Sequence, residues 1–442
     1  MNLSGPKQKG RRQTLFDGLT LDVLKAFAMR KIAIIGGGIT GVTTAYTLAK
    51  RGFVVTMFER HRYAAMETSF ANGGQLSASN AEVWTHHSTI LKGLKWMHKS
   101  DAPLLVNPTP SWHKLSWFLE FMTSMKDYER NTIETTRLAI AARAHLFEWA
   151  RAENIDFDLK KQGILHIYRD KVGFENARRV SALLAKGGLF RRAVTPVEMK
   201  AIEPTLAGNY HGGYFTESDS TGDIHKFCTG LASAAERLGA RTMYDQHVTS
   251  VTPKNQTITI QVLHSDTLTN TYNFDGVVVC AGVASKQFAT QLGDRVNIYP
   301  VKGYSITVNL NDEESQAGAP QVSLLDDETK LVTSRLGVHR FRVAGTAEFN
   351  GYNMDIRSDR IQPSVDWVQQ CFPKINTRSV VSWAGLRPMM PNMMPKVGRG
   401  RAPNVFYNTG HGHLGWTLSA VTADMVAETV SQKFGIINQP LF

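Results

Sequence analysis

A run of apolar residues followed by spaced glycines, Lys31-Ile-Ala-Ile-Ile-Gly-Gly-Gly-Ile-Thr-Gly41, decides the fold of the first part of this chain. The apolar run predicts a buried strand, and apolar residues at helical spacing after it predict a helix. Gly36 would allow the tight turn between them, Gly38 would let the backbone approach a pyrophosphate, and Gly41 would let helix and strand pack closely. This order is typical of a dinucleotide-binding unit.

A second strand and an acidic residue directly after it complete the same unit. Val54-Val-Thr-Met-Phe58 follows Gly52, where the helix is expected to end, and Glu59 comes directly after this strand. A carboxylate about 20 residues beyond the glycines is placed to accept hydrogen bonds from ribose hydroxyls. We therefore expect a dinucleotide site here, and the alternative is a glycine-rich turn with a purely structural role.

The glycine motif leaves the dinucleotide open between NAD and FAD, because both contain the same adenosine diphosphate half. The sequence contains no second complete unit of strand, glycine turn, helix, strand and acid that would form a separate nicotinamide domain. A flavin that the substrate reduces directly is the simpler arrangement.

Composition excludes several classes of protein. The chain has 442 residues, 42% of them hydrophobic and 20% charged, which excludes collagen, bulk disorder and a disulfide-stapled miniprotein. Its cysteines, Cys228, Cys280 and Cys371, fit no zinc spacing and favour a reducing compartment. No apolar run reaches the roughly 20 residues of a membrane span. The formal net charge of +12 favours anionic partners without specifying them.

Residues 1–28 are expected to form a basic N-terminal extension ahead of the first strand. The pair Arg11-Arg12 resembles a twin-arginine export signal, but Asp17, Asp22 and Lys25 interrupt the stretch that follows. We therefore expect a cytoplasmic protein.

Several segments far apart in the chain carry a family resemblance. They are Thr68-Ser-Phe-Ala-Asn-Gly-Gly-Gln75, Tyr299-Pro-Val-Lys-Gly-Tyr-Ser305, Arg342-Val-Ala-Gly-Thr-Ala-Glu348, Trp383-Ala-Gly-Leu-Arg-Pro388 and Asn408-Thr-Gly-His-Gly-His-Leu-Gly-Trp416. Together with the glycine motif, they resemble the bacterial D-amino-acid dehydrogenases of the glycine oxidase and D-amino-acid oxidase superfamily, from about Met29 to about Val430. Members of that superfamily oxidise different amines, so the resemblance leaves the substrate open.

The resemblance implies a two-domain flavoprotein of mixed α/β and α+β class. A Rossmann-like FAD-binding domain and a sheet-based substrate domain would both be discontinuous in sequence. The FAD-binding domain would comprise 29–80, 216–297 and 385–434, the substrate domain 81–215 and 298–384, and a C-terminal tail 435–442. The sequence pattern agrees, because Phe227, Leu231, Ala234 and Leu238 share one helical face and Val277-Val-Val-Cys280 predicts a buried parallel strand.

The resemblance also implies which residues surround a FAD. The segment Ser69–Gln75 would wrap the flavin, and the alternative for it is an ordinary polar turn. The helix after Gly410 would direct its N-terminus at the flavin, where negative charge accumulates on reduction. Ser69–Gln75 has no histidine or cysteine as an attachment point, so non-covalent FAD is expected. The expected cofactor-binding residues are Gly36, Gly38, Gly41, Glu59, Arg60, Ser69, Asn72, Gly73, Gly74, Gln75, Val248, Gly282, Gly410, Gly412, His413 and Leu414.

Arg387 is the first of three expected catalytic residues. It matches the arginine with which the family holds the substrate carboxylate, and its planar fork suits a bidentate pair. The alternative is a surface arginine that precedes a proline turn.

Tyr304 and His413 are the other two expected catalytic residues. Tyr304 would border the substrate pocket, with Lys302 and Arg342 as further candidates, although polar residues on strands also commonly face solvent. His413 would donate a hydrogen bond to the flavin, and loop packing is its alternative. His411 and His413 lack complementary ligands nearby, so no metal site is expected.

The resemblance implies oxidative deamination of D-amino acids. A hydride would pass from the α-carbon to flavin N5, and water would hydrolyse the resulting imine to a 2-oxo acid and ammonia. Positioning and electrostatic stabilisation can supply much of the rate, so no protein nucleophile is needed. The nearest alternative is an FAD-dependent oxidase or dehydrogenase of glycine, sarcosine or another N-substituted or cyclic amino acid. A remote alternative is a flavin-binding sensor without turnover.

Residues 84–117 suggest a partner besides the amino-acid substrate. They contain Trp84, Trp96, Trp112 and Trp117 interleaved with lysines. This mixture suits peripheral contact with a membrane surface, on the cytoplasmic face of the inner membrane, where quinone or another acceptor would take the electrons. Ordinary packing is the alternative for the segment. No recognition motif for nucleic acid accompanies it, so we expect no such partner.

Overall fold

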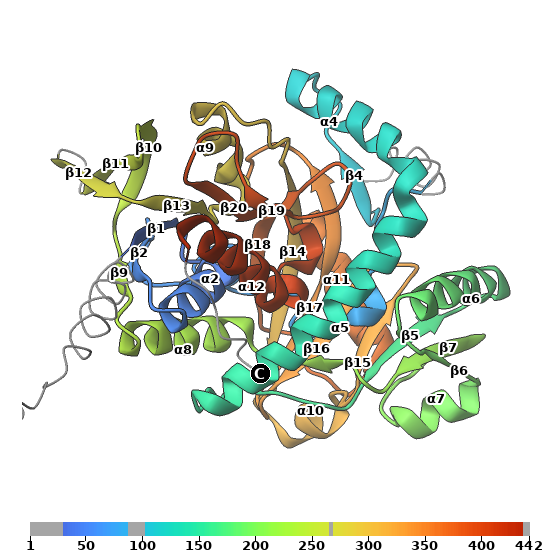
Figure 1. Cartoon of the computed structure of the whole chain (residues 1–442). Coiled ribbons are helices and arrows are strands. Elements are labelled where there is room, and N and C mark those ends of the chain that lie inside the picture. Colours follow the sequence, from blue (N-terminus) through green and yellow to red (C-terminus); the bar gives the residue numbers. More distant parts are fainter. Residues whose placement is uncertain (1–29, 87–101, 265–267, 436–442) are drawn as a thin grey trace, which may run out of the picture.

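The computed structural model describes residues 30–86, 102–264 and 268–435 of the chain (Figure 1). The expected extension 1–28, residues 436–442 of the expected tail, and Trp96 lie outside the described residues.

The first sheet has six strands in the order β19-β20-β13-β1-β2-β9 (Figure 1). All neighbours are parallel except β19, which runs antiparallel to β20. In β1, Ile32 and Ile34 pack into one core, and Ala33 and Ile35 pack into another on the opposite face. Successive side chains point to opposite faces, so a sheet covered on both sides needs an unbroken apolar run. The strands are β1 (Lys31–Ile35), β2 (Val54–Phe58), β9 (Arg241–Met243), β13 (Gly276–Val279), β19 (Lys396–Arg399) and β20 (Val405–Thr409).

Helices cover one face of this sheet and a small antiparallel sheet contributes to the core on the other. Helix α2 (Ile39–Lys50) packs against α8 (Ile224–Arg237) and α12 (Gly415–Phe434). On the second face, alternate residues of β11 lie in the same core as β13. The covering strands are β10 (His247–Lys254), β11 (Thr257–His264) and β12 (Leu268–Phe274), and α9 (Ser285–Gln291) follows the short helix η3 (Gly282–Ala284).

Leu238 departs from the expected pattern. Phe227, Leu231 and Ala234 are buried on α8 as expected, but Leu238 is 43% exposed. The helix ends at Arg237, so the helical repeat no longer determines the direction of the next side chain.

The second sheet has nine strands and is mainly antiparallel. Its order is β18-β14-β17-β16-β15-β5-β7-β6, and β4 pairs with β17. Only the β15–β5 and β17–β4 pairs are parallel among its described strands. The strands are β4 (Leu104–Val106), β5 (Ile164–Tyr168), β6 (Arg192–Val194), β7 (Gly212–Thr216), β14 (Tyr299–Asn309), β15 (Ser323–Asp326), β16 (Leu331–Leu336), β17 (Arg340–Phe349) and β18 (Val380–Met389).

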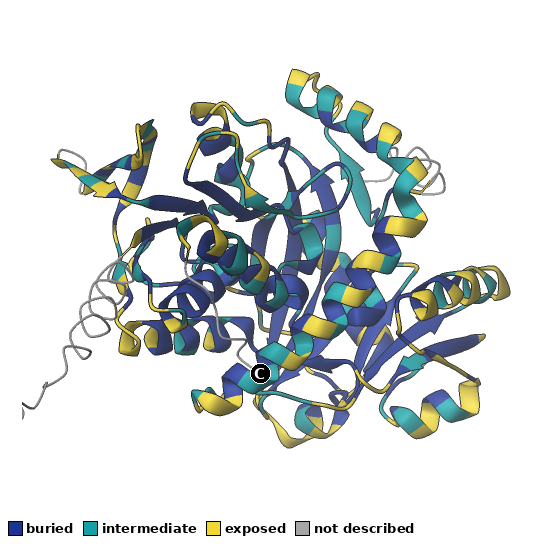
Figure 2. Cartoon of the chain, viewed as in Figure 1, coloured by how far each residue is buried: buried dark blue, intermediate teal, exposed yellow. Residues whose placement is uncertain are grey.

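Several helices surround the second sheet. The long helix α5 (Tyr128–Ala152) also packs against α12, so it links the two parts of the molecule (Figure 1). Figure 2 shows both sheets buried and the outer faces of these helices exposed. The remaining helices are α4 (Trp112–Thr123), α6 (Lys171–Lys186), α7 (Pro196–Ile202), α10 (Glu313–Gly318) and α11 (Ser358–Cys371), with short helices η1 (Ala78–Asn80), η2 (Ser124–Asp127) and η4 (Gly412–Leu414), and β3 (Gln75–Leu76) pairs with β8 (Ser220–Thr221).

The expected fold class is therefore confirmed: a Rossmann-like sheet stands beside a separate, mainly antiparallel sheet. The expected domain border at 384/385 falls inside β18 (Val380–Met389). The borders of the two domains stay a prediction.

Candidate active site

A cavity of about 850 Å³ is lined by residues from both large sheets. One expected cofactor residue, Gly41, does not line it and lies instead where α2 packs on the turn after β1. The structure brings the other expected cofactor and catalytic residues to this one cavity: Gly36, Gly38, Glu59, Arg60, Ser69, Asn72, Gly73, Gly74, Gln75, Val248, Gly282, Tyr304, Arg387, Gly410, Gly412, His413 and Leu414.

Backbone geometry explains the glycines at one end of the cavity. Gly36 has φ +104°, and an added Cβ would lie 2.7 Å from the carbonyl oxygen of Cys280. At Gly41 an added Cβ would lie 1.8 Å from the carbonyl oxygen of Gly36. A side chain at Gly36 would therefore push the turn after β1 away from the end of β13, and one at Gly41 would push α2 away from that turn.

Glu59 lies beside this turn, directly after β2. Its Oε2 accepts from the Gly37 amide at 2.6 Å and its Oε1 from the His61 amide at 2.9 Å. Its neighbour Arg60 forms an ion pair with Glu67. Glu59 is thus held as an acceptor at the end of the strand, where its side chain lines the cavity.

Ser69 connects the next segment to the start of α2. Its Oγ accepts from the Ile39 amide at 3.1 Å, and no side chain of Gly38 is available to cap the helix. Further along, Gly74 has φ +68°, and its amide donates to Oδ1 of Asn72 at 2.9 Å. The segment is therefore bent back against β16, where an added Cβ at Gly73 would meet Val332 at 2.6 Å.

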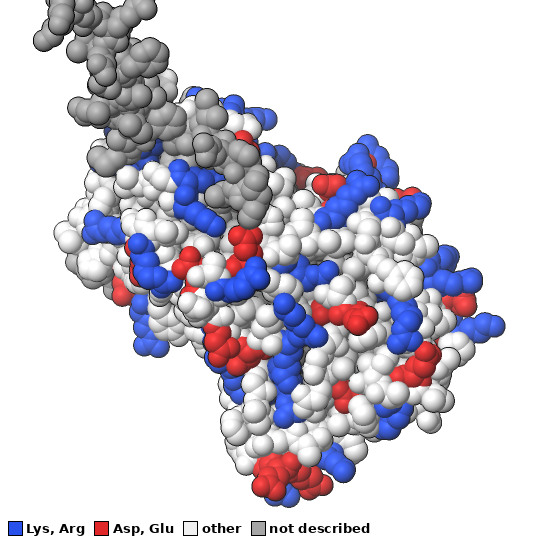
Figure 3. Space-filling view, turned by 60° about the horizontal axis from the view of Figure 1, so that its bottom comes forward, with Lys and Arg blue, Asp and Glu red and all other residues white. Residues whose placement is uncertain are grey.

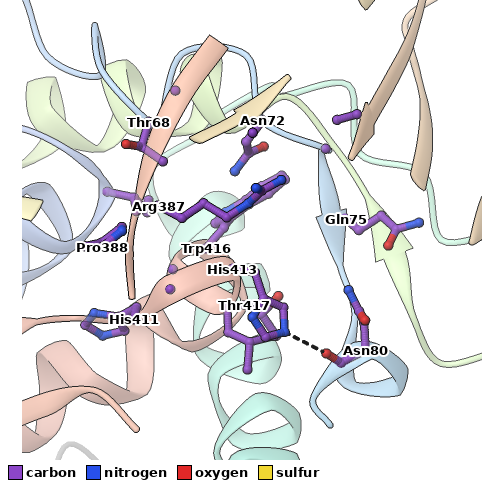
Figure 4. Close-up of a pocket in the computed structure, with 18 of the residues that line it drawn as sticks. Thr68, Asn72, Gln75, Asn80, Arg387, Pro388, His411, His413, Trp416 and Thr417 are labelled. Carbon is purple, nitrogen blue, oxygen red and sulfur yellow. Dashed lines mark hydrogen bonds between the residues drawn. The ribbon is translucent and has the colours of Figure 1, made fainter. Parts of the chain in front are cut away.

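Arg387 extends from β18 among the other labelled side chains of the cavity (Figure 4). Its Nη1 donates to the Thr346 carbonyl at 2.8 Å and its Nη2 to the Gly345 carbonyl at 3.2 Å. Within the described part of the chain no carboxylate pairs with it. Burial lowers the pKa of the guanidinium to about 10, which still leaves it protonated at neutral pH. The cavity therefore contains a cation whose partners are neutral carbonyls.

Gly303 makes room for that cation. It lies opposite Gly385 in the β14–β18 pair, and an added Cβ would stand 2.3 Å from the guanidinium carbon of Arg387. The side chain of Arg387 thus passes directly over the β14 backbone, a path that only glycine permits.

His413 lies near Arg387 and is held on two sides. Its ring stacks on Trp84 with 4.7 Å between centroids, and its Nε2 donates to the Asn80 carbonyl at 3.3 Å (Figure 4). Burial, with a smaller contribution from the Arg387 charge, lowers its pKa to about 4. The imidazole is therefore neutral at physiological pH and does not compete with Arg387 for an anion.

The hydroxyl of Tyr304 has a buried partner. It donates to Oε2 of Glu348 at 2.7 Å, and Glu348 also pairs with Lys302 at 3.2 Å between Nζ and Oε1. Although burial alone would raise the Glu348 pKa, these hydrogen bonds and the lysine charge hold it below its ordinary value. A catalytic role for Tyr304 stays a prediction.

Of the two further candidates, Lys302 does not line the cavity, and Arg342 lies on strand β17 as expected but does not line the cavity either. Lys302 is fully buried and donates to Oδ1 of Asn353 at 2.7 Å, whereas Arg342 donates to the Thr307 hydroxyl at 3.2 Å. Polar strand residues can reach either face of a sheet, and the sequence pattern did not show which face these two take.

His411 faces Thr422 rather than a metal ligand. Its Nε2 lies 2.9 Å from the Thr422 hydroxyl, its Nδ1 has no partner, and burial lowers its pKa to about 3. Across the described ranges, no three His, Cys, Asp or Glu side chains are grouped so that they could hold a metal ion.

Comparison with known proteins identifies the family. The family model described as DAO, FAD dependent oxidoreductase, matches residues 31–429. The chain belongs to this family. The D-amino acid dehydrogenase 3 of Mesorhizobium japonicum is 61% identical over 408 residues, covering 92% of this chain and 98% of that protein. The D-amino acid dehydrogenase of Paramagnetospirillum magneticum is 39% identical over 414 residues, covering 91% and 95%.

Solved structures show the same fold at low sequence identity. The L-proline dehydrogenase from P. horikoshii has a TM-score of 0.72 at 17% identity and covers 93% of this chain and 96% of its own. The glycine oxidase from Geobacillus kaustophilus has a TM-score of 0.71 at 19% identity and covers 91% and 95%. The expected family resemblance is confirmed, and the chain is an FAD-dependent oxidoreductase.

The residues of the cavity fit a FAD. The close turn at Gly36 and the held carboxylate of Glu59 suit the adenosine diphosphate half. Several polar atoms are buried without a partner on residues that line the cavity, among them Oε1 of Gln75 and Nε1 of Trp416. The volume also lies within the usual range for cofactor pockets, ~300–1,000 Å³.

Sequence reasoning missed several residues of the cavity. Gly303 and Thr346 lie in segments that the family resemblance identified, but neither was named as part of the site. A glycine inside a strand pattern indicates a close backbone approach, so Gly303 could have been found. Glu82 gave no signal: it lines the cavity, accepts from the Tyr128 hydroxyl at 2.6 Å, and burial raises its pKa.

Positive and negative side chains are mixed on the outer surface. Figure 3 shows lysine and arginine spread over one face among acidic side chains. Among the described helices, none is long and apolar enough to cross a membrane.

Proposed function

We propose that this chain is an FAD-dependent D-amino acid dehydrogenase, which converts a D-amino acid to an imine that water hydrolyses to a 2-oxo acid and ammonia. FAD, when bound, supplies the two-electron acceptor. The unpaired guanidinium of Arg387 in the cavity is the observation that carries the proposal. The relative that is 61% identical over nearly its whole length and named D-amino acid dehydrogenase 3 supports the substrate class.

Arg387 binds the α-carboxylate of the substrate. Two of its N–H groups are engaged by the carbonyls of Gly345 and Thr346, which fixes the plane of the guanidinium. The remaining N–H groups are left for a planar, bidentate anion. The cation therefore orients the substrate at its carboxylate and leaves the amine and the α-hydrogen to be placed by the rest of the cavity.

Neutral His413 keeps the carboxylate on Arg387. A second cation here would compete for the substrate carboxylate. Burial keeps the imidazole uncharged, because it lowers the pKa of His413 to about 4. Its stacking on Trp84 and its hydrogen bond to Asn80 also fix the ring in the wall of the cavity. The stacked rings of His413 and Trp84 thus form an uncharged, aromatic part of the cavity wall.

Anaerobic mixing of the FAD-loaded protein with single amino acids tests the function. We expect D-amino acids to bleach the flavin absorbance and their L-enantiomers to leave the absorbance unchanged. The reduced protein should be reoxidised slowly by air and rapidly by a quinone or dye. Bleaching by glycine or sarcosine together with rapid peroxide formation would instead favour the oxidase. Persistent yellow colour with every amino acid would favour the sensor and contradict the proposal.

FAD is held without a covalent bond in this proposal. The segment Ser69–Gln75 contains no histidine or cysteine, and all of its residues except Phe70 line the cavity. Acid precipitation of the loaded protein should leave the flavin in the supernatant, and a yellow pellet would contradict non-covalent binding. The domain borders given by the sequence resemblance are part of the same proposal.

We further propose that α4 makes peripheral contact with a membrane surface, from which a quinone can take the electrons. Trp112 is 81% exposed, and Leu115, Leu119 and Met122 are about half exposed at helical spacing along the same helix. The opposite face is anchored, because Trp117 is buried and its Nε1 donates to the Met389 carbonyl at 2.8 Å. An exposed apolar stripe on an anchored helix fits an interface rather than a core.

Sedimentation with vesicles tests this contact. The variant Trp112→Gln/Leu115→Gln/Leu119→Gln should lose binding to phosphatidylglycerol-containing vesicles, while Val197→Gln on α7, which replaces an equally exposed apolar residue, should keep it. Equal binding of both variants would contradict a role for α4. Activity with a water-soluble dye should not change in either.

A further inference from the structure

Thr346 has a backbone conformation that branched residues rarely adopt. Its φ is +52°, although it lies within β17. Crowding around Cβ makes this left-handed region unfavourable for threonine. The neighbouring register between β14 and β17 shifts between Lys302 and Tyr304, so the strand bulges at this point. The fold therefore maintains a costly local conformation beside the cavity.

This conformation directs two consecutive carbonyls at one side chain. In a regular strand, successive carbonyls point in opposite directions and could not both reach the same guanidinium. Here the carbonyls of Gly345 and Thr346 accept from Nη2 and Nη1 of Arg387 at 3.2 and 2.8 Å. The left-handed turn at Thr346 therefore explains how Arg387 is held without an acidic partner.

The side chain of Thr346 is also unusual. Its hydroxyl oxygen is buried and has no hydrogen-bond partner, although the residue lines the same cavity as Arg387. Buried hydroxyls are nearly always paired, and an unpaired one destabilises the fold. Glycine would adopt this backbone conformation more easily than threonine. The left-handed conformation and the unpaired hydroxyl thus occur together at a residue that also accepts from Arg387.

We propose that Thr346 is a positioning residue for the substrate carboxylate: its carbonyl orients Arg387, and its hydroxyl donates to the carboxylate that Arg387 binds. The proposal rests on the function proposed above. Thr346 therefore has two roles, because the same turn places the Arg387 guanidinium and the Thr346 hydroxyl beside one another. The bound carboxylate supplies the partner that the hydroxyl lacks.

Three variants and a matched control test the role of the hydroxyl. Thr346→Val preserves the branched shape but removes the hydroxyl, Thr346→Ser preserves the hydroxyl, and Thr346→Ala is a second variant without it. The control is Thr216→Val on β7, whose buried hydroxyl also lacks a partner but which does not line the cavity. All are compared as FAD-loaded full-length proteins.

The steady-state constants separate positioning from packing. Thr346→Val and Thr346→Ala should raise KM for the D-amino acid about tenfold or more, the usual effect of losing a hydrogen bond to a charged group. They should change kcat much less, leave FAD content unaltered and not lower Tm, because the hydroxyl that they remove has no partner in the substrate-free protein. Thr346→Ser should restore KM to within about threefold, and Thr216→Val should not change it. A KM for Thr346→Val within twofold of the parent would overturn the proposal.

Binding of propionate separates this proposal from the proposed function. Propionate has the carboxylate without the amine, and it can be titrated by its perturbation of the flavin spectrum without turnover. The dissociation constant should rise in Thr346→Val and recover in Thr346→Ser even if no D-amino acid is oxidised. Equal propionate affinity in all variants would overturn the role of Thr346. A clear difference in propionate affinity without oxidation of any D-amino acid would overturn only the proposed dehydrogenase activity.

Discussion

At the scale of single residues, Arg387 shows how burial without an ion pair makes a binding site. A buried guanidinium would ordinarily require a carboxylate, and here it has two carbonyls. Sequence resemblance alone identified the arginine, because its segment is characteristic. It could not identify Gly303 or the carbonyl partners, because these reach Arg387 only through the pairing of β14, β17 and β18.

Replacement of Arg387 by lysine should weaken substrate binding and leave FAD binding unchanged. An ammonium group cannot make the planar, bidentate contact, so we expect kcat/KM to fall about 10- to 100-fold. The FAD content, measured by absorbance, should stay constant. Arg378→Lys is a matched control, because Arg378 is exposed on the loop before β18. Equal kcat/KM for the parent protein and Arg387→Lys would remove Arg387 from the site.

The buried histidines predict that stability decreases in mild acid. Burial lowers the pKa of His411 to about 3 and that of His413 to about 4, against an ordinary value of 6.5. Below pH 6.5 the unfolded chain gains protons that the folded chain does not. Each histidine should therefore lower the free energy of unfolding by up to about 1.4 kcal/mol per pH unit as the pH falls from 6.5 towards 4.

Denaturant unfolding at several pH values between 7.5 and 4.5 measures this effect. His411→Asn should reduce the slope of stability against pH, whereas His211→Asn, at an exposed position, should not. An unchanged slope in His411→Asn would show that His411 is not the group that titrates.

At the scale of elements, the packing of α2 on β1 depends on one glycine. An added Cβ at Gly41 would overlap the Gly36 carbonyl at 1.8 Å, whereas one at Gly38 would make ordinary contact with Ser69 at 3.5 Å. The strand, the turn and the helix were predictable from local sequence because their residues are consecutive. The glycines were predictable for the same reason.

Gly41→Ala should therefore disrupt the fold and Gly38→Ala should not. We expect the first substitution to destabilise the protein by more than about 4 kcal/mol, because strand and helix must separate. The second should preserve Tm within a few degrees, whatever its effect on FAD affinity. Thermal melting of both apoproteins makes the comparison, and similar Tm values for the two would contradict it.

At the scale of the whole molecule, the cavity is lined by residues of both large sheets, so a bound cofactor should stabilise both together. Binding only to the folded state adds about 2.7 kcal/mol when the free ligand is 100 times its dissociation constant. We expect the Tm of the apoprotein to rise continuously with added FAD, followed by circular dichroism, and NAD at the same concentrations to have no effect. A Tm independent of FAD would contradict this expectation.

The sequence by itself determined the dinucleotide unit, the family and the identity of Arg387, because each depends on short segments whose spacing restricts the backbone or is characteristic of relatives. Only the tertiary structure decided that Lys302 pairs with Glu348 outside the cavity, that Gly303 makes room for Arg387, and that Thr346 turns two carbonyls onto it. The reason is physical, because strand register decides which face of the sheet a side chain takes and which distant residue lies opposite it. A one-residue shift in register moves the side chain to the other face and gives it a different partner.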